Sequence, residues 1–190
     1  MKPPVFLDRD GVINMNRPDY VRNPGQWIPI PGAVASVARL HQAGYPVIVV
    51  TNQSGVARGF YTEEDVEAVH SLMAAAFRAA GADVTGFFYC PHHPSDGCRC
   101  RKPETGMIDR ARREHALPPG GWMVGDAETD MELGRRAGLR TILVLSGRGR
   151  SQLQKIRAEK RIEPDFITES LVSAADVILS AQLRKGLPGL

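Results

Sequence analysis

The sequence predicts an α/β protein with a Rossmann-like parallel sheet flanked by helices, and two observations support this fold class. Short runs of branched apolar residues alternate along the chain with segments whose apolar residues recur at helical spacing. Several of the apolar runs end in acidic or other polar residues, which is typical of strands that reach the carboxyl edge of a sheet. Strands and helices that alternate in this way form βαβ units with right-handed crossovers. We therefore expect polar groups to gather at one edge of a single parallel sheet.

The expected elements follow the chain in order. A strand over residues 5–7 ends at an acidic pair, and the proline-containing segment 14–31 is expected to fold as a loop over the site, because its prolines forbid a long helix. Further strands are expected at residues 46–50, 84–89, 121–124, 141–145 and 165–167, and helices at 33–43, 62–80, 106–115, 129–137 and 170–183. Thr62 suits the N-cap of the second helix. A turn is expected at 146–150, and the basic stretch 154–161 is interpreted as a solvated helix face.

The composition is that of an ordinary globular protein. The chain has 190 residues, of which 43% are hydrophobic and 24% charged, enough for one full core and too few for two generous domains. We expect a single domain over residues 1–190, and a monomer. The 24 basic and 21 acidic residues give a formal charge of +3 and are spread along the chain, so the charge pattern does not favour nucleic acid as a partner.

Two further features of the sequence indicate the cellular compartment in which the protein is expected. No apolar run approaches the roughly 18 to 20 residues that span a bilayer, and residues 1–4 lead straight into a strand rather than a signal-peptide core. The three cysteines are odd in number and clustered, which disfavours a disulfide framework. We expect a cytoplasmic protein that acts on a small molecule, with no membrane partner.

The acidic pair Asp8 and Asp10 lies directly after the first strand and before Gly11. On an extended strand, side chains two residues apart share a face, so two carboxylates would be forced together. A cation relieves that repulsion, and Mg²⁺ prefers a few carboxylate oxygens together with water and substrate phosphate. Asp126 ends another strand, so Asp8 and Asp126 are the expected Mg²⁺ ligands.

The polar strand ends together supply what phosphoryl transfer requires. A carboxylate attacks a phosphate dianion only when charge is cancelled, and Lys102 adds a positive charge while the Thr51 hydroxyl holds phosphate oxygens. With Asp8 as nucleophile, Asp10 protonates the leaving oxygen and later deprotonates a water. Asp130 lies on the same strand end as Asp126 and supports the site. Taken alone, each of these patterns is more often a simple turn, and it is their combination that favours catalysis.

A second metal site is predicted in the loop 90–100. Cys90, His92, Cys98 and Cys100 offer three thiolates and one imidazole, a set that suits tetrahedral structural zinc. A Cys98–Cys100 disulfide would close a very small ring and leave Cys90 over, and ordinary reduced thiols are the other alternative. We expect zinc to stiffen the loop that positions Arg101 and Lys102.

These residues resemble a known family. The matching segments are 8–12, 51–53, Lys102 and 125–130, and they look like the four ordered motifs of the haloacid-dehalogenase-like phosphatases over about two-thirds of the chain. Within that superfamily, segments 51–59, 90–94 and 98–103 resemble the phosphatases that remove the 7-phosphate of heptose 1,7-bisphosphate. The resemblance implies a fold without a cap domain, an aspartyl-phosphate intermediate, Mg²⁺ on Asp8, Asp126 and the Asp10 carbonyl, and structural zinc.

The resemblance also implies substrate contacts and shows departures from the family. The implied contacts are Thr51, Asn52, Gln53, Ser54, Arg101 and Lys102, together with Asn16, Asp19 and Tyr20 in the first loop. Val12 replaces the threonine of many relatives, and Ala127 stands where the family can have a lysine beside the metal ligand. The zinc loop is also short between His92 and Cys98. The change at Ala127 weakens any expectation of a contact at that position.

Three alternative functions stay open at this point. Histidinol-phosphate phosphatases also carry a zinc loop, and comparison of the two substrates separates them from a heptose phosphatase. A zinc-containing nucleic-acid-binding module is a more distant alternative, since the zinc loop lacks aromatic residues for stacking. A scaffold without activity is the third, although every expected catalytic carboxylate is present. Arg148 and Arg150 are interpreted as a solvated turn, with a contact to a substrate phosphate as the alternative.

Overall fold

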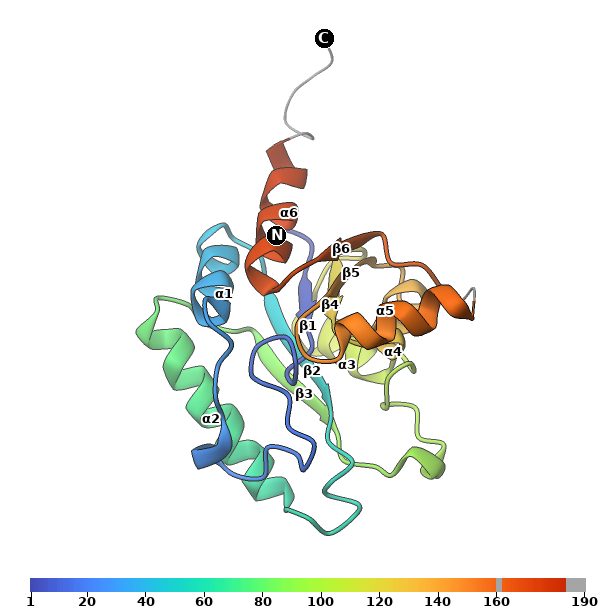
Figure 1. The fold of residues 1–190 in the computed structure, drawn as a ribbon. Helices are drawn as coiled ribbons and strands as arrows, with labels where there is room; N and C mark the ends of the chain where they lie inside the picture. The colour runs from blue at the N-terminus through green and yellow to red at the C-terminus, as the bar shows by residue number, and fades with distance from the viewer. Residues whose placement is uncertain (160–161, 184–190) are drawn as a thin grey trace.

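The computed structural model describes residues 1–159 and 162–183, and its described strands form one six-stranded parallel sheet (Figure 1). The order of the strands across the sheet is β3-β2-β1-β4-β5-β6. Their bounds are β1 (Val5–Leu7), β2 (Val47–Asn52), β3 (Gly86–Cys90), β4 (Trp122–Gly125), β5 (Arg140–Val144) and β6 (Phe166–Thr168). The chain runs outward from β1 to one side and then, from β4 on, to the other. The predicted parallel α/β sheet is confirmed.

Helices cover both faces of the sheet. On one face lie α1 (Ala33–Gln42), α2 (Glu63–Ala79) and α6 (Leu171–Leu183), and on the other α3 (Gly106–Glu114), α4 (Glu128–Arg136) and α5 (Gly149–Ala158). The alternation along β1 shows why: Val5 and Leu7 belong to the first core, whereas Phe6 belongs to the second, and all three side chains are fully buried. A strand buried on both faces needs apolar residues at every position. The core therefore lies in two layers on either side of β1 and β2.

Most expected elements are present, with shifts of one or two residues at their ends. Thr62 caps α2 as predicted, because its hydroxyl accepts a hydrogen bond from the Asp65 backbone N–H. The largest difference concerns α5, which begins at Gly149 inside the expected turn 146–150. Only Ile156 of this helix is a large apolar residue in the core, which left little periodic signal in the sequence. Residues 160 and 161 of the predicted basic face lie outside the described residues.

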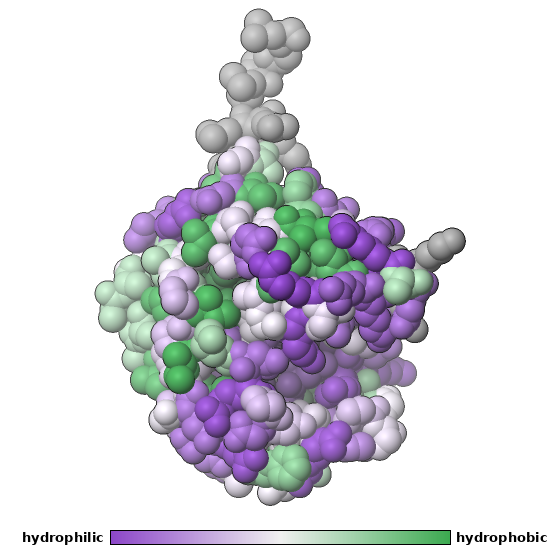
Figure 2. Space-filling model, viewed as in Figure 1, coloured by the Kyte–Doolittle hydropathy of each residue, from purple (hydrophilic) through white to green (hydrophobic). Residues whose placement is uncertain are grey.

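Two short 3-10 helices interrupt the loops near the carboxyl edge, η1 (Pro24–Gln26) and η2 (Pro94–Asp96). The loop after β1 folds back on itself, since Asn14 pairs as an isolated bridge with both Asp10 and Pro29. Hydrophilic residues dominate the lower half of the surface in Figure 2, over the loops that follow β1, β2 and β3. Within the described ranges, no helix combines the length and the apolar composition that crossing a bilayer would need.

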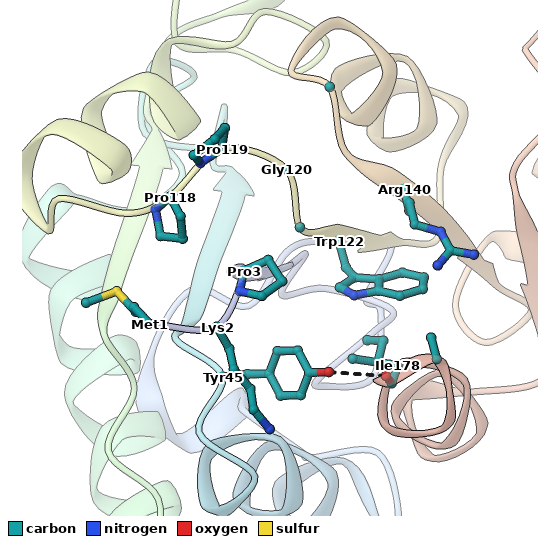
Figure 3. Close-up of a pocket in the computed structure, with 13 residues that line it drawn as sticks. Met1, Lys2, Pro3, Tyr45, Pro118, Pro119, Gly120, Trp122, Arg140 and Ile178 are labelled. Carbon is teal, nitrogen blue, oxygen red and sulfur yellow. Dashed lines mark hydrogen bonds between the residues drawn. The ribbon is translucent and has the colours of Figure 1, made fainter. Parts of the chain in front are cut away.

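The opposite edge of the sheet carries a cavity of about 520 Å³ near the amino ends of β4 and β5. Trp122, Tyr45 and Pro118 are among its lining residues (Figure 3). The Tyr45 hydroxyl donates to the Ile178 carbonyl at 3.3 Å, and the Arg140 guanidinium lies 4.3 Å from the centre of the Trp122 ring. These two polar groups of the cavity are thus engaged with neighbouring residues.

Candidate active site

Asp8 stands at the end of β1 with its two carboxylate oxygens in different surroundings. Oδ1 accepts a hydrogen bond from the Arg9 backbone N–H at 2.7 Å and lies 2.8 Å from the Lys102 ammonium. No described residue donates to Oδ2. The side chain is buried and lines a cleft of about 330 Å³ at the carboxyl edge of the sheet. One oxygen is therefore held in place while the other is available to attack a substrate.

Lys102 lies between this carboxylate and a second one. Its ammonium contacts Asp8 Oδ1 and Asp130 Oδ1, each at 2.8 Å, and donates to the Val50 carbonyl at 3.1 Å. Burial lowers the pKa of Lys102, but the charges of Asp130 and Asp8 raise it by more, so the net pKa lies above its usual value. The lysine remains a fixed positive charge between two carboxylates.

Asn52 determines where that lysine sits. Its side-chain carbonyl accepts from the Lys102 backbone N–H at 3.0 Å, and its amide donates to the Lys102 carbonyl at 3.3 Å. Because Asn52 is the last residue of β2, these two bonds tie the loop that carries Lys102 to the sheet. The loop segment thus takes its position from a strand end.

The pKa values of Asp8 and Asp10 move in opposite directions. Burial raises the pKa of Asp8 to about 6, with Lys102 opposing the shift and Asp130 adding to it. Burial also acts on Asp10, but the Arg9 charge and hydrogen bonds from Asn14, Arg9 and Gln53 outweigh it and lower the pKa. The two carboxyl groups therefore differ in environment although only one residue separates them in sequence.

Asp10 is held by donors from three side chains, two on its own loop and one from the loop after β2. The Arg9 guanidinium contacts Oδ2 at 2.9 Å, the Asn14 amide donates to Oδ1 at 2.9 Å, and the Gln53 amide donates to Oδ2 at 2.9 Å. The Arg9 side chain is fully buried, whereas 24% of the Asp10 side chain remains exposed in the cleft. The carboxylate is fixed in orientation and still reaches the substrate space.

Asp126 follows β4 and faces the end of β1. A Cβ atom on Gly11 would lie 2.2 Å from its Oδ2, and Gly11 has φ of +86°, so glycine serves both the close approach and the turn. The Arg148 backbone N–H donates to Oδ2 at 2.8 Å, and its guanidinium lies 3.1 Å from Oδ1. Arg148 is thus a partner of Asp126 that also lines the cleft, not only a solvated turn residue.

Three carboxylates meet at this point in a way that suits a divalent cation. Oxygen atoms of Asp8, Asp126 and Asp130 lie within 4.8 Å of one another, and all three residues are buried. Burial and the Asp8 charge raise the pKa of Asp126, with Arg148 acting in the opposite direction. Buried carboxylate oxygens repel one another, and a bound Mg²⁺, which prefers oxygen ligands, would offset that repulsion.

The cleft contains most of the predicted substrate residues, but not all of them. Its lining comprises Asp8, Asp10, Tyr20, Thr51, Asn52, Ser54, Arg58, Pro94, Arg101, Lys102, Thr129, Asp130 and Arg148. Asn16, Asp19 and Gln53 are absent from it. Gln53 is buried beneath the cleft, where its amide binds Asp10 and Thr51, and Asp19 pairs with Arg17.

Sequence reasoning missed Arg58 and Thr129 as cleft residues. Arg58 is the only cationic residue between the end of β2 and the start of α2, and that position was the signal that could have identified it. Arg150, by contrast, is exposed and pairs with Glu169 at 2.7 Å. It lies outside the cleft lining, in agreement with its interpretation as a solvated residue.

The four predicted zinc ligands lie together beside the cleft. Their ligand atoms fall within 4.8 Å of one another. Sγ of Cys90 lies 3.5 Å from both His92 Nδ1 and Cys98 Sγ, and Cys100 Sγ lies 3.2 Å from His92 Nδ1 and 3.5 Å from Cys98 Sγ. A tetrahedral zinc with bonds of about 2.3 Å to sulfur and about 2.0 Å to nitrogen places its ligand atoms at similar separations. The cysteines are free thiols, so the disulfide alternative is excluded.

Comparisons with known proteins place the chain among phosphatases. Residues 6–135 match the family model described as polynucleotide kinase 3 phosphatase, and residues 99–174 match the one described as HAD-hydrolase-like. A D-glycero-beta-D-manno-heptose-1,7-bisphosphate 7-phosphatase of Pseudomonas aeruginosa is 40% identical over 92% of this chain and 97% of its own length. The enzyme of the same name from Pseudomonas putida is 44% identical over 80% of this chain and 87% of its own.

A solved structure gives the same result in three dimensions. The D,D-heptose 1,7-bisphosphate phosphatase of Bordetella bronchiseptica, crystallised with magnesium and phosphate, superposes with a TM-score of 0.88 at 36% identity. The match covers 95% of this chain and 99% of that one. The similarity in three dimensions therefore extends over nearly the whole of both chains.

Proposed function

This chain belongs to the family of D-glycero-β-D-manno-heptose-1,7-bisphosphate 7-phosphatases, and we propose on that premise that it hydrolyses the 7-phosphate of this sugar bisphosphate to leave the 1-phosphate. The reaction serves nucleotide-activated heptose synthesis for lipopolysaccharide core or another glycan. One observation carries the proposal: Asp8 presents a free oxygen to the cleft while its other oxygen is held by Lys102.

The chain's own residues supply the proposed chemistry. Asp8 Oδ2 attacks the phosphorus, and the bond to the sugar oxygen breaks as that oxygen takes a proton from Asp10. Asp10 must acquire this proton in the substrate complex, because its pKa is lowered in the free protein. The product is the free sugar 1-phosphate and an aspartyl phosphate on Asp8. Asp10, now a carboxylate, removes a proton from a water, whose oxygen attacks the phosphorus. The bond from phosphorus to Asp8 Oδ2 breaks, which releases phosphate and restores the Asp8 carboxylate. Lys102 keeps Asp8 in place and offsets the negative charge of the phosphoryl group.

Magnesium fits this site on the chemistry of its donors. Asp8 and Asp126 would hold it with their carboxylates, and Asp10 would hold it with its backbone carbonyl, as the family resemblance implies. When bound, Mg²⁺ supplies positive charge that offsets the repulsion between the carboxylates and the phosphate. Asp130 supports the site through Lys102.

Zinc is proposed as the occupant of the second cluster, held by Cys90, His92, Cys98 and Cys100. The separations among these four ligand atoms support the assignment, and a set of four protein ligands leaves no position for a reacting water. We assign zinc a structural role, because Arg101 and Lys102 follow Cys100 directly in the chain. A rigid loop keeps both cations at the cleft.

The substrate contacts and the cellular setting complete the proposal. Thr51, Asn52, Ser54, Arg101, Lys102 and Tyr20 line the cleft and are assigned to substrate. Asn16, Asp19 and Gln53 are not among the cleft residues, so we give them no direct contact. We propose a monomer of one domain that acts in the cytoplasm, where thiol groups remain reduced.

Substrate comparison tests the proposed function. We expect kcat/KM for heptose 1,7-bisphosphate, assayed as phosphate release with Mg²⁺, to exceed that for histidinol phosphate by at least about tenfold. Faster turnover of histidinol phosphate would contradict the proposed substrate and identify the protein as a histidinol-phosphate phosphatase. A 3′-phosphorylated oligonucleotide belongs in the same assay because of the family model over residues 6–135. Asp8→Asn is the control that shows the measured activity belongs to this cleft.

A further inference from the structure

A buried tyrosine lies behind Asp10 and is not itself among the residues that line the cleft. Tyr61 is 6% exposed and comes from the loop between β2 and α2. Its hydroxyl donates to Gln53 Oε1 at 2.7 Å. Neither Tyr61 nor Gln53 belongs to the cleft lining, so neither is placed to touch a substrate.

The hydrogen bond from Tyr61 fixes which way the Gln53 amide points. An amide offers an acceptor on one side and two donors on the other. With Oε1 facing the Tyr61 hydroxyl, Nε2 donates to Asp10 Oδ2 at 2.9 Å and to Thr51 Oγ1 at 2.8 Å. The reversed amide would place an oxygen against the carboxylate of Asp10. Every polar atom of the Gln53 side chain thus has a partner, and two of those partners line the cleft.

The surroundings of Tyr61 hold its ring in one position. A Cβ atom on Gly55 would lie 2.1 Å from the ring, so the ring packs directly against the backbone there. The Tyr20 ring also meets it edge to face, with 5.8 Å between the ring centroids. Burial raises the pKa of Tyr61 to about 12, so its hydroxyl keeps its proton and remains a donor near neutral pH.

We propose that Tyr61 is a positioning residue for the acid/base group, acting on Asp10 through the Gln53 amide. The inference rests on the proposed function, because it needs Asp10 to transfer protons to and from the substrate. Removal of the hydroxyl leaves Gln53 Oε1 without a donor and frees the amide to turn. The carboxylate of Asp10 then loses one of the side chains that set its orientation, while the cleft surface is unchanged.

The test compares two tyrosine hydroxyls in opposite halves of the molecule. We expect Tyr61→Phe to lower kcat for heptose 1,7-bisphosphate by roughly three- to tenfold, with KM changed less than twofold. Tyr45→Phe is the matched control, since this equally buried tyrosine donates to the Ile178 carbonyl at the opposite edge of the sheet. That variant should keep the wild-type kcat. Thermal unfolding of both variants monitors any loss of structure.

A double-mutant cycle tests whether the effect travels through Gln53. Gln53→Met keeps the side-chain volume and removes the amide, so Tyr61→Phe should have little further effect on kcat in that background. Equal kcat for Tyr61→Phe and Tyr45→Phe would overturn the inference alone, and so would fully additive effects in the cycle. A wild-type protein that releases no phosphate from the sugar bisphosphate would overturn the proposed function and this inference with it.

Discussion

The two edges of the sheet carry cavities that differ in size and in chemistry. The cavity at the amino ends of β4 and β5 is the larger, about 520 Å³ against about 330 Å³ for the cleft at the carboxyl ends. In the larger one, Arg140 lies over the Trp122 ring, so its charge is already engaged (Figure 3). In the smaller one, buried carboxylates and one buried lysine face a common space.

The difference shows what marks an active site in this protein. Carboxyl groups crowd together at the carboxyl edge because several parallel strands end there. Packing them costs stability, and the cost is offset by fixed donors such as Lys102. The opposite edge has aromatic and proline side chains that stabilise the fold without such a cost. Changes at the carboxyl edge should therefore lower activity, whereas changes at the opposite edge should affect stability alone.

The largest expected effect follows from removal of the buried lysine. Lys102→Met leaves Asp8 and Asp130 without their shared cation, so kcat should fall by at least about 100-fold. The free energy of unfolding should fall by about 3–5 kcal/mol, because two buried carboxylates lose their partner. Steady-state kinetics and urea denaturation measure the two quantities.

Lys155→Met is the matched control for that variant. Lys155 pairs with Glu128 at 3.2 Å but is 47% exposed, so its loss should change stability by no more than about 1 kcal/mol and leave kcat unchanged. Similar losses of kcat and of stability in the two lysine variants would contradict the claim that the buried ion pair of Lys102 contributes more than the exposed one.

Two neighbouring histidines, His92 and His93, allow a direct test of the zinc ligands. His92→Gln should lose bound zinc and lower the midpoint of thermal unfolding by at least about 5 °C, since metal binding contributes to folding. His93→Gln is the control, because the His93 ring contacts Ser95 rather than the thiols. Elemental analysis should give one zinc per chain for the His93 variant and for the wild type. Equal zinc in the His92 variant would refute the ligand set.

A buried histidine predicts a pH dependence of stability. His70 packs against the Phe87 ring, with 4.9 Å between ring centroids, and no described group pairs with its Nε2. Burial first, and then the Arg9 charge, lower its pKa from 6.5 to about 3. Below pH 6.5 the unfolded chain binds a proton that the folded chain does not bind until about pH 3. Stability is therefore lost as the pH falls through this window.

The size of that loss is open to direct measurement. Between pH 7 and pH 5, His70 should contribute a decrease of about 2 kcal/mol in the free energy of unfolding. His70→Gln should remove this part of the pH dependence, and the same change at the partly exposed His41 should not. An identical pH dependence in wild type and His70→Gln would show that the buried ring is not held neutral.

The smallest effect is expected at the opposite edge of the sheet. Trp122→Phe removes part of the ring that packs against Arg140 and Phe166, so the free energy of unfolding should fall by about 1–2 kcal/mol. The kcat should stay within about twofold of wild type. A large loss of activity would mean that the two edges are coupled through β4, and the contrast drawn between them would not hold.

Much of this site could be predicted because its residues lie at strand ends. Asp8, Asp10 and Asp126 follow apolar runs that could only be strands, and the thiols of the zinc loop lie close together in sequence. Lys102 was predicted with the polar strand ends, and Arg101 was predicted from the family resemblance.

Other features depend on contacts between distant segments, which the sequence does not display. Tyr61 reaches Asp10 only through Gln53, and the assignment of Gln53 to substrate came from resemblance, although the side chain is buried. Arg148 meets Asp126 because α5 starts earlier than its sparse apolar pattern indicated. Pairings of this kind require the packed fold.

The central claim, that Asp8 forms a covalent phosphoenzyme, has a direct test. Asp10→Asn removes the base for hydrolysis, and acetyl phosphate has a leaving group that needs no proton from Asp10. The Asp10→Asn variant is allowed to react with acetyl phosphate and Mg²⁺, and the reaction is then quenched with acid. Mass spectrometry of its peptides should find one phosphoryl group on Asp8. The same treatment of a variant that also carries Asp8→Asn should find none. A phosphoryl group on another residue, or none in the Asp10→Asn variant, would contradict the account.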